Sequence, residues 1–284
     1  MLLRLFCPIL AFAAAVSVSS STSEGQNLND LVTGLRWVSY APSNYFPAER
    51  PPVLPGDASV QEDLETLHSA GFTGLITYGA QVENVPRISR NIGFTAMLLG
   101  IWDPLSVAER SEALKAVREN SGLIAGLIVG NEGLLTGRYN IGMLCRAMGE
   151  IKLASGKPVS TTEPVDWLLT EPQLATCSSF ITANAHPYFS HQKAPAQAVQ
   201  WTVEAWNAVR SKYPDKPLFL KRLVYPAQET MGSVRKHRKN ITWHWRKHLL
   251  SSRTLRPSTL LPASRKGCSS NRGAYGDPTV GRRL

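Results

Sequence analysis

Short apolar runs alternate with amphipathic stretches along most of this 284-residue chain, and this alternation limits the possible folds more than any other feature. Such a pattern predicts parallel strands separated by helices. We predict seven strands, at residues 35–40, 74–78, 96–101, 126–134, 159–162, 180–183 and 218–221. Helices are predicted at residues 59–70, 82–92, 106–119, 141–154 and 195–212. The repeated unit favours an α/β fold of the (β/α)8 TIM-barrel type, which typically needs about 250 residues.

The barrel is expected to be incomplete at its C-terminal strand–helix unit. The alternation stops near residue 228, so we assign residues 31–228 to the barrel and residues 229–284 to a basic tail that is disordered or aberrant. Residues that precede the first strand read as a polar linker up to Asp30. No glycine-rich phosphate motif follows the first strand, which weighs against a dinucleotide-binding sheet.

The net charge of +10 is concentrated at the C-terminal end. Residues 221–284 hold fifteen Lys and Arg against two acidic residues, a net of +13, so the remaining chain carries −3. The basic and aromatic segments 235–239 and 243–248 resemble a nucleic-acid or polyanion-binding arm. An exported protein rarely meets nucleic acid, and we therefore expect no nucleic-acid partner.

Residues 1–22 have the features of a signal peptide. Arg4 precedes an apolar run from Leu5 to Val18 that is too short to span a bilayer, and small and Ser-rich residues follow. We expect a secreted protein, in the extracellular space, cell wall or periplasm, with no membrane association after signal removal. Cys145 and Cys177 read as small buried residues, and a disulfide between them stays open because their spacing alone does not establish it.

The residues at the C-terminal ends of the predicted strands, or just beyond them, share one chemical character. In a TIM barrel the active site is built from such residues. Carboxylates, amides and aromatic rings together suit a sugar, whose hydroxyls accept and donate hydrogen bonds while its CH face stacks on a ring. Neither a phosphate-binding loop nor a His/Cys metal cluster is among them, and we expect no cofactor and no metal. The set comprises Tyr40, Tyr78, Trp102, Asp103, Asn131, Glu132, Glu163, His186 and Tyr188.

Six short motifs at successive strand ends resemble glycoside hydrolase family 17, the retaining β-1,3-glucanases and related glucosyltransferases. The resemblance extends from about Leu35 to Pro226. The motifs are Arg-Trp-Val-Ser-Tyr-Ala-Pro, Gly-Phe-Thr-Gly-Leu-Ile-Thr-Tyr-Gly, Gly-Ile-Trp-Asp-Pro, Gly-Asn-Glu, Lys-Pro-Val-Ser-Thr-Thr-Glu and Asn-Ala-His-Pro-Tyr-Phe.

The resemblance implies a role for each matched residue. Glu132 would be the general acid/base and Asn131 would bind the sugar 2-hydroxyl. A substrate-binding role would fall to the remaining positions, which are Tyr40, Tyr78, Trp102, Glu163, His186 and Tyr188. A β-glucan oligo- or polysaccharide would be the substrate, and we expect a monomer.

Arg222 departs from the family pattern. A retaining mechanism needs a second carboxyl group, about 5–5.5 Å from the first, to attack the anomeric carbon. The family places a Glu at the end of strand seven, and here that position is Arg222. Glu163 and Glu229 are weak substitutes. A reading-frame shift from about Lys221 would explain the missing nucleophile, the missing eighth unit and the charge of the tail together.

Two functions of the barrel therefore remain open, beside a third in which the protein binds a partner through its basic tail. One is a retaining glycoside hydrolase for β-glucan that uses Glu132 and is impaired by Arg222. The other is a non-catalytic barrel that binds glucan in the same aromatic cleft.

Overall fold

Seven parallel strands form one sheet in the computed structural model, which describes residues 20–46, 49, 51–80, 82–187, 190–191 and 194–223. Each strand pairs with the next one in the sequence, so the order in the sheet is β1 to β7. The strands are β1 (Trp37–Tyr40), β2 (Gly74–Thr77), β3 (Ala96–Ile101), β4 (Ile124–Asn131), β5 (Val159–Pro164), β6 (Ile181–Ala185) and β7 (Leu218–Leu223).

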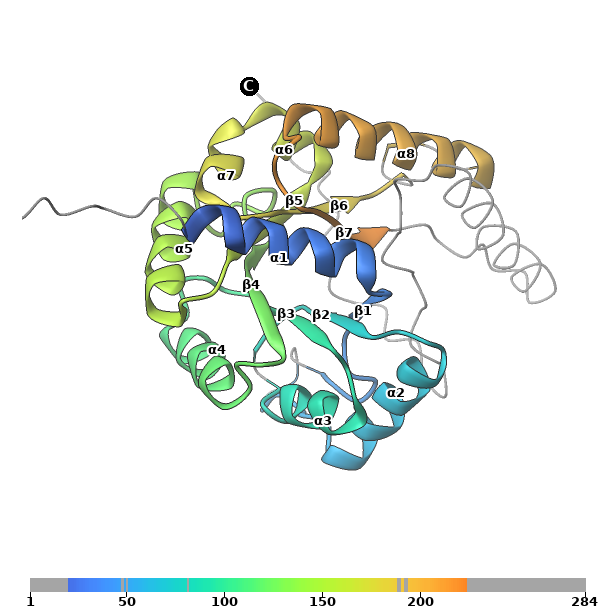
Figure 1. Ribbon diagram of the computed structural model, residues 1–284, viewed down its shortest axis with the longest axis vertical. Coiled ribbons are helices and arrows are strands. Elements are labelled where there is room, and N and C mark those ends of the chain that lie inside the picture. Colours follow the sequence, from blue (N-terminus) through green and yellow to red (C-terminus); the bar gives the residue numbers. More distant parts are fainter. Residues whose placement is uncertain are drawn as a thin grey trace, which may run out of the picture.

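Helices connect the strands and lie around the outside of the sheet (Figure 1). They are α2 (Asp57–Ser69), α3 (Asn84–Ile92), α4 (Val107–Glu119), α5 (Ile141–Ser155), α6 (Val165–Thr170), α7 (Pro172–Cys177) and α8 (Pro195–Lys212), and α1 (Ser20–Gly34) precedes β1. Local signals in the sequence explain several helix ends. The Ser106 side chain accepts a hydrogen bond from the Glu109 N–H at the start of α4, and Gly156 ends α5 in the left-handed conformation.

The sheet curves into a nearly closed barrel, which confirms the predicted TIM-type fold. The Ser39 hydroxyl of β1 donates a hydrogen bond to the Lys221 carbonyl of β7, so the first and last strands meet. Within the described part of the chain no eighth strand lies between them. The barrel is therefore incomplete at its C-terminal unit.

Aromatic rings fill the barrel interior near the N-terminal ends of the strands. The Trp37 and Phe219 ring centroids are 5.2 Å apart, and those of Phe180 and Phe219 are 5.7 Å apart. Aliphatic side chains from β2, β3 and β4 complete this cluster with Ile76, Leu98 and Ile128. A larger apolar layer packs the outer face of the strands against the helices.

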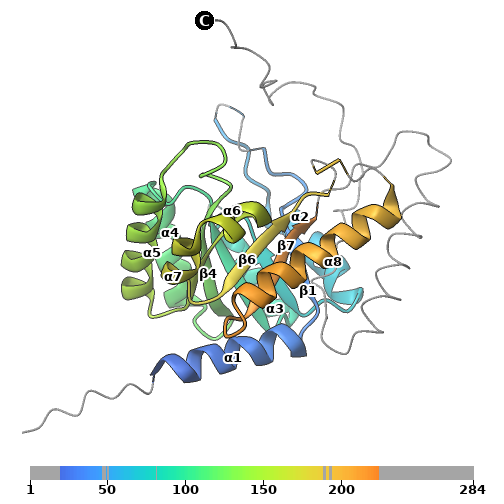
Figure 2. The same ribbon diagram turned by 90° about the horizontal axis from the view of Figure 1, so that it is seen from above.

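Helix α1 covers this end of the barrel (Figure 2), so the expected polar linker was wrong. Leu28 is buried against the interior cluster, and Leu31, Val32 and Leu35 pack beside it. The Trp37 indole N–H donates to the Leu31 carbonyl at 3.0 Å. These four aliphatic residues follow the spacing i, i+3, i+4 and i+7, which places them on one face of a helix.

Two short helices, α6 and α7, were not predicted between β5 and β6. A disulfide joins Cys145 in α5 to Cys177 at the end of α7, with Cα atoms 5.5 Å apart. The bridge left open by the sequence is therefore present.

The helices of the described ranges include none that is both long and apolar enough to cross a membrane. Residues 1–19, which hold most of the predicted signal peptide, and the predicted tail lie outside the described residues.

Candidate active site

Glu132 directly follows β4 at the C-terminal mouth of the barrel. Its Oε1 accepts a hydrogen bond from Asn184 Nδ2 at 2.7 Å and lies 2.5 Å from His186 Nε2. The Glu132 and His186 side chains are 18% and 11% exposed, so solvent reaches the pair from the mouth. The structure thus brings the predicted acid/base and the predicted histidine together.

Asn184 was not among the predicted site residues, although a signal for it was present. Alternate residues of a strand point to the same face. Asn184 and His186 are two residues apart at the end of β6, and both contact the same carboxylate oxygen. Once His186 is assigned to the site, the two-residue spacing also points to Asn184.

A second unpredicted residue, Lys221, lies beside Asn131. The residue is 1% exposed, which is rare for a lysine. Lys221 Nζ donates to Asn131 Oδ1 at 3.0 Å and lies 4.5 Å from the centroid of the Tyr78 ring. This cation–π contact and hydrogen bond join the ends of β2, β4 and β7 at the barrel mouth.

Glu163 lies beneath the turn that follows β4. Its side chain is fully buried, and Oε1 accepts hydrogen bonds from the N–H groups of Gly133 at 3.0 Å and Leu134 at 3.2 Å. Burial raises the pKa of the Glu163 carboxyl from 4.5 to about 7. The backbone hydrogen bonds from Leu134 and Gly133 oppose this rise, and the negative charge of Glu132 adds to it.

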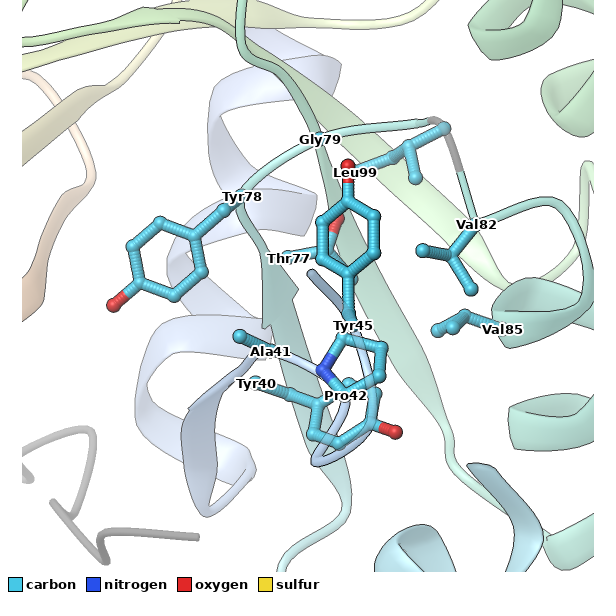
Figure 3. Close-up of a pocket in the computed structure, with 10 residues that line it drawn as sticks. All are labelled: Tyr40, Ala41, Pro42, Tyr45, Thr77, Tyr78, Gly79, Val82, Val85 and Leu99. Carbon is cyan, nitrogen blue, oxygen red and sulfur yellow. The ribbon is translucent and has the colours of Figure 1, made fainter. Parts of the chain in front are cut away.

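Tyr40 lines a small pocket at the ends of β1 and β2. Its ring is 3% exposed, and its hydroxyl donates to Asp63 Oδ2 of α2 at 3.2 Å. Burial and then the charge of Asp63 raise the pKa of the Tyr40 hydroxyl. Figure 3 shows the Tyr78 ring pointing away from Val82 and Val85, which line the opposite side of the pocket.

Trp102 lies at the end of β3 with 40% of its surface exposed. The Arg138 guanidinium stacks over its ring at 4.9 Å. Glu109, a buried residue of α4, accepts hydrogen bonds from the Trp102 N–H at 2.8 Å and the Asp103 N–H at 2.9 Å. These contacts hold an exposed indole ring at the rim of the mouth.

Arg222 occupies the strand position that the sequence assigned to the nucleophile. The register of β6 and β7 pairs Arg222 with Asn184, after an irregularity that leaves Lys221 between two paired positions. Tyr188 lies outside the described residues. Among the residues described, no group of three or more His, Cys, Asp or Glu side chains could hold a metal ion.

Comparison with known proteins places this chain in a family. A model of the BtgE/BtgC glycoside hydrolase domain matches residues 38–237. A curated relative, "Probable family 17 glucosidase SCW10" from Saccharomyces cerevisiae, is 26% identical over 183 residues. That match covers 61% of this chain and 45% of the yeast protein, so the chain spans less than half the length of this relative.

Solved structures share the fold at low sequence identity. An endo-laminarinase from Formosa Hel1_33_131 superposes with a TM-score of 0.62 at 13% identity, covering 75% of this chain and 74% of that one. A GH2 beta-galacturonidase from Eisenbergiella tayi superposes with a TM-score of 0.53 at 13% identity. That match covers 77% of this chain and 41% of the galacturonidase chain. The family match extends over most of the barrel and includes Asn131, Glu132, Asn184 and His186. The chain therefore belongs to the family of BtgE/BtgC glycoside hydrolase domains.

Proposed function

We propose that this chain acts on β-glucan as a glycoside hydrolase domain, with Glu132 as the general acid/base. One observation carries the proposal: Glu132 Oε1 lies at the barrel mouth within 2.7 Å of Asn184 Nδ2 and 2.5 Å of His186 Nε2. A group that transfers a proton must be held in one orientation and must be reachable by substrate. Both conditions are met by a carboxyl group fixed by two side chains and still partly exposed.

The names of the relatives support a glucan substrate. One is called a glucosidase and another an endo-laminarinase, and laminarin is a β-1,3-glucan. The residues around Glu132 suit a chain of glucose units, because Trp102 offers an exposed ring for stacking and Asn131 offers an amide for a hydroxyl. We propose the same sugar-binding role for Tyr78, His186 and Tyr188.

In the proposed reaction the Glu132 carboxyl donates its proton to the glycosidic oxygen as the bond to the anomeric carbon breaks. The oxygen of a water molecule finally bonds to that carbon, and one proton of the water returns to Glu132. A retaining enzyme needs a second carboxylate to attack that carbon. Arg222 stands at the strand position where the resemblance implies this group, and a guanidinium cannot serve as the nucleophile. We therefore propose that turnover is impaired.

A specific observation favours a second function, a non-catalytic glucan-binding barrel. Two basic residues, Lys221 and Arg222, occupy the end of β7, and the Lys221 ammonium is bonded to Asn131. This arrangement keeps hydrogen-bonding groups for a sugar at the mouth while the nucleophile is replaced.

Laminarin tests the two functions. The full chain should release reducing sugar, and Glu132→Gln should lower kcat at least about 100-fold, because general acid catalysis contributes this much. Glu62→Gln, at an exposed position of α2, is the control and should leave kcat unchanged. An unchanged kcat in Glu132→Gln would exclude Glu132 as the acid/base. An equal fall of kcat in Glu62→Gln would show that the effect is not specific to Glu132, and would exclude it likewise. Binding of laminarin without release of sugar would support the second function, and Arg222→Glu should then restore turnover.

We further propose that the protein is exported and acts as a monomer. The disulfide between Cys145 and Cys177 supports export, since such bonds persist in oxidising compartments. The predicted signal peptide points the same way.

A further inference from the structure

The turn that carries Glu132 has an unfavourable backbone conformation. Glu132 has φ of +53°, in the left-handed region that residues with a side chain rarely adopt. Such a conformation persists only where surrounding contacts enforce it. The contacts that enforce it here all involve β5 and the loop after β4.

Two consecutive residues of β5 hold this turn from both sides. The Glu132 N–H donates to the Thr162 carbonyl at 2.8 Å, as a continuation of the strand ladder. The next two N–H groups, of Gly133 and Leu134, both donate to Glu163 Oε1. The backbone therefore reverses around Glu132 with three successive N–H groups bound to β5.

Tyr139 closes the space behind the turn. A Cβ atom added to Gly133 would lie 2.0 Å from Tyr139 Cζ, and one added to Gly130 would lie 2.3 Å from the Tyr139 hydroxyl oxygen. The hydroxyl lies 3.4 Å from Glu163 Oε1 and 3.1 Å from the Gly133 nitrogen. Burial and the charge of Glu163 raise the pKa of Tyr139, so the phenol stays protonated as a donor.

We propose that Glu163 is a positioning residue, whose buried carboxyl fixes the Gly133–Leu134 turn and thereby directs the Glu132 side chain toward Asn184 and His186. Its burial removes Glu163 from the open mouth, so it acts through Glu132 and not by touching sugar. The catalytic consequence rests on the proposed function of Glu132. The direction of the Glu132 side chain in the protein without substrate does not depend on that function.

Substitutions at position 163 separate this role from a general effect on stability. Glu163→Asp withdraws the carboxyl by one methylene from both N–H groups, whereas Glu163→Gln keeps an acceptor oxygen at the same reach. Glu109→Asp is the matched control, because Glu109 is also a buried carboxylate that accepts backbone N–H groups at a neighbouring strand end. Its loop does not carry Glu132.

The imidazole ¹⁵N resonance of His186 in the full chain, assigned with His186→Gln, reports the contact with Glu132 at a fixed pH. Glu163→Asp should move this resonance from its wild-type position, and crystals should show the Glu132–His186 contact lengthened beyond about 3.5 Å. Glu163→Gln and Glu109→Asp should keep the wild-type position. An unmoved resonance in Glu163→Asp, or an equal shift in Glu109→Asp, would overturn the proposal.

Kinetics on laminarin supply the catalytic readout. Glu163→Asp should lower kcat about 10- to 100-fold with little change in KM, because misplacement of a catalytic group mainly affects the transition state. If the wild-type chain releases no sugar, the proposed hydrolysis fails, and the His186 resonance still decides the positioning role. A KM increase with unchanged kcat would contradict positioning and indicate direct contact with sugar.

Discussion

Glu132 combines a strained backbone with strong side-chain hydrogen bonds. A left-handed conformation in a residue other than glycine costs on the order of 1 kcal/mol. Its carboxyl accepts a hydrogen bond from Asn184 and contacts His186, and a typical hydrogen bond within a protein contributes about 1 kcal/mol. The strain is thus offset locally, as is common at sites where side-chain direction matters more than stability.

The raised pKa of Glu163 predicts how stability depends on pH. The unfolded chain loses this proton near pH 4.5, whereas the folded protein holds it until about pH 7. The folded state therefore binds more protons between these values, and its stability falls as pH rises from about 4.5 to 7. A shift of this size corresponds to roughly 3 kcal/mol.

Urea unfolding of the wild-type chain and Glu163→Gln from pH 4 to 8 measures this contribution. The unfolding free energy of the wild type minus that of Glu163→Gln should decrease as pH rises from about 4.5 to 7, and should stay level above pH 7. A difference that does not vary with pH would show that Glu163 ionises normally.

The sequence predicted which residues lie at the barrel mouth better than it predicted how deeply each side chain is buried. Asn131, Glu132 and His186 lie at the same edge because each ends or directly follows a strand, and the C-terminal ends of parallel strands meet there. That rule places residues at an edge but does not give side-chain depth. Tyr40 and Glu163 also follow or end strands, yet both side chains are buried and bonded to neighbouring elements. The burial of a side chain depends on the residues that pack against it, and position at a strand end does not reveal them.

At the scale of elements, predicted boundaries were accurate where strong local signals exist. Helix α8 spans Pro195–Lys212 as predicted, with proline in its first turn, and β3 spans Ala96–Ile101 as predicted. The helices α6 and α7 have only six residues each, too few to show a helical period. Helix α1 was missed because its polar composition outweighed the spacing of its aliphatic residues Leu28, Leu31 and Val32.

Packing of α1 onto the barrel predicts a large effect for one substitution. Leu28 is 2% exposed and lies against the interior aromatic cluster. Leu28→Ala should lower the unfolding free energy by about 2–5 kcal/mol, the usual range for a leucine truncated in a core. Asn27→Ala, on the exposed side of the same helix, should change it by less than about 0.5 kcal/mol.

Thermal and urea unfolding of the two variants would measure this difference. Equal effects of the two substitutions would mean that α1 contributes to stability only through helix formation and not through its contact with the barrel.

At the scale of the whole molecule, the barrel is held unevenly around its circumference. Strands β2 to β6 each have a hydrogen-bonded neighbour on both sides. Strands β1 and β7 each pair on one side, and the Ser39 hydroxyl joins them across the seam. We call this junction of β1 and β7 the seam. In a complete TIM barrel an eighth strand would pair with both of these strands. Among the described residues, a side-chain hydrogen bond spans the seam instead.

This unevenness predicts a gradient of amide hydrogen exchange. Backbone hydrogen bonds open through local unfolding, which needs less free energy where fewer neighbouring strands hold the chain. We expect the slowest exchange in β3 and β4 and the fastest strand exchange in β1 and β7. Hydrogen–deuterium exchange with peptide mapping of the full chain measures this order. Ser39→Ala should accelerate exchange in β1 and β7 while leaving β3 and β4 unchanged, because it removes a hydrogen bond between the first and last strands. Uniform protection of all seven strands in the wild type would contradict an open seam.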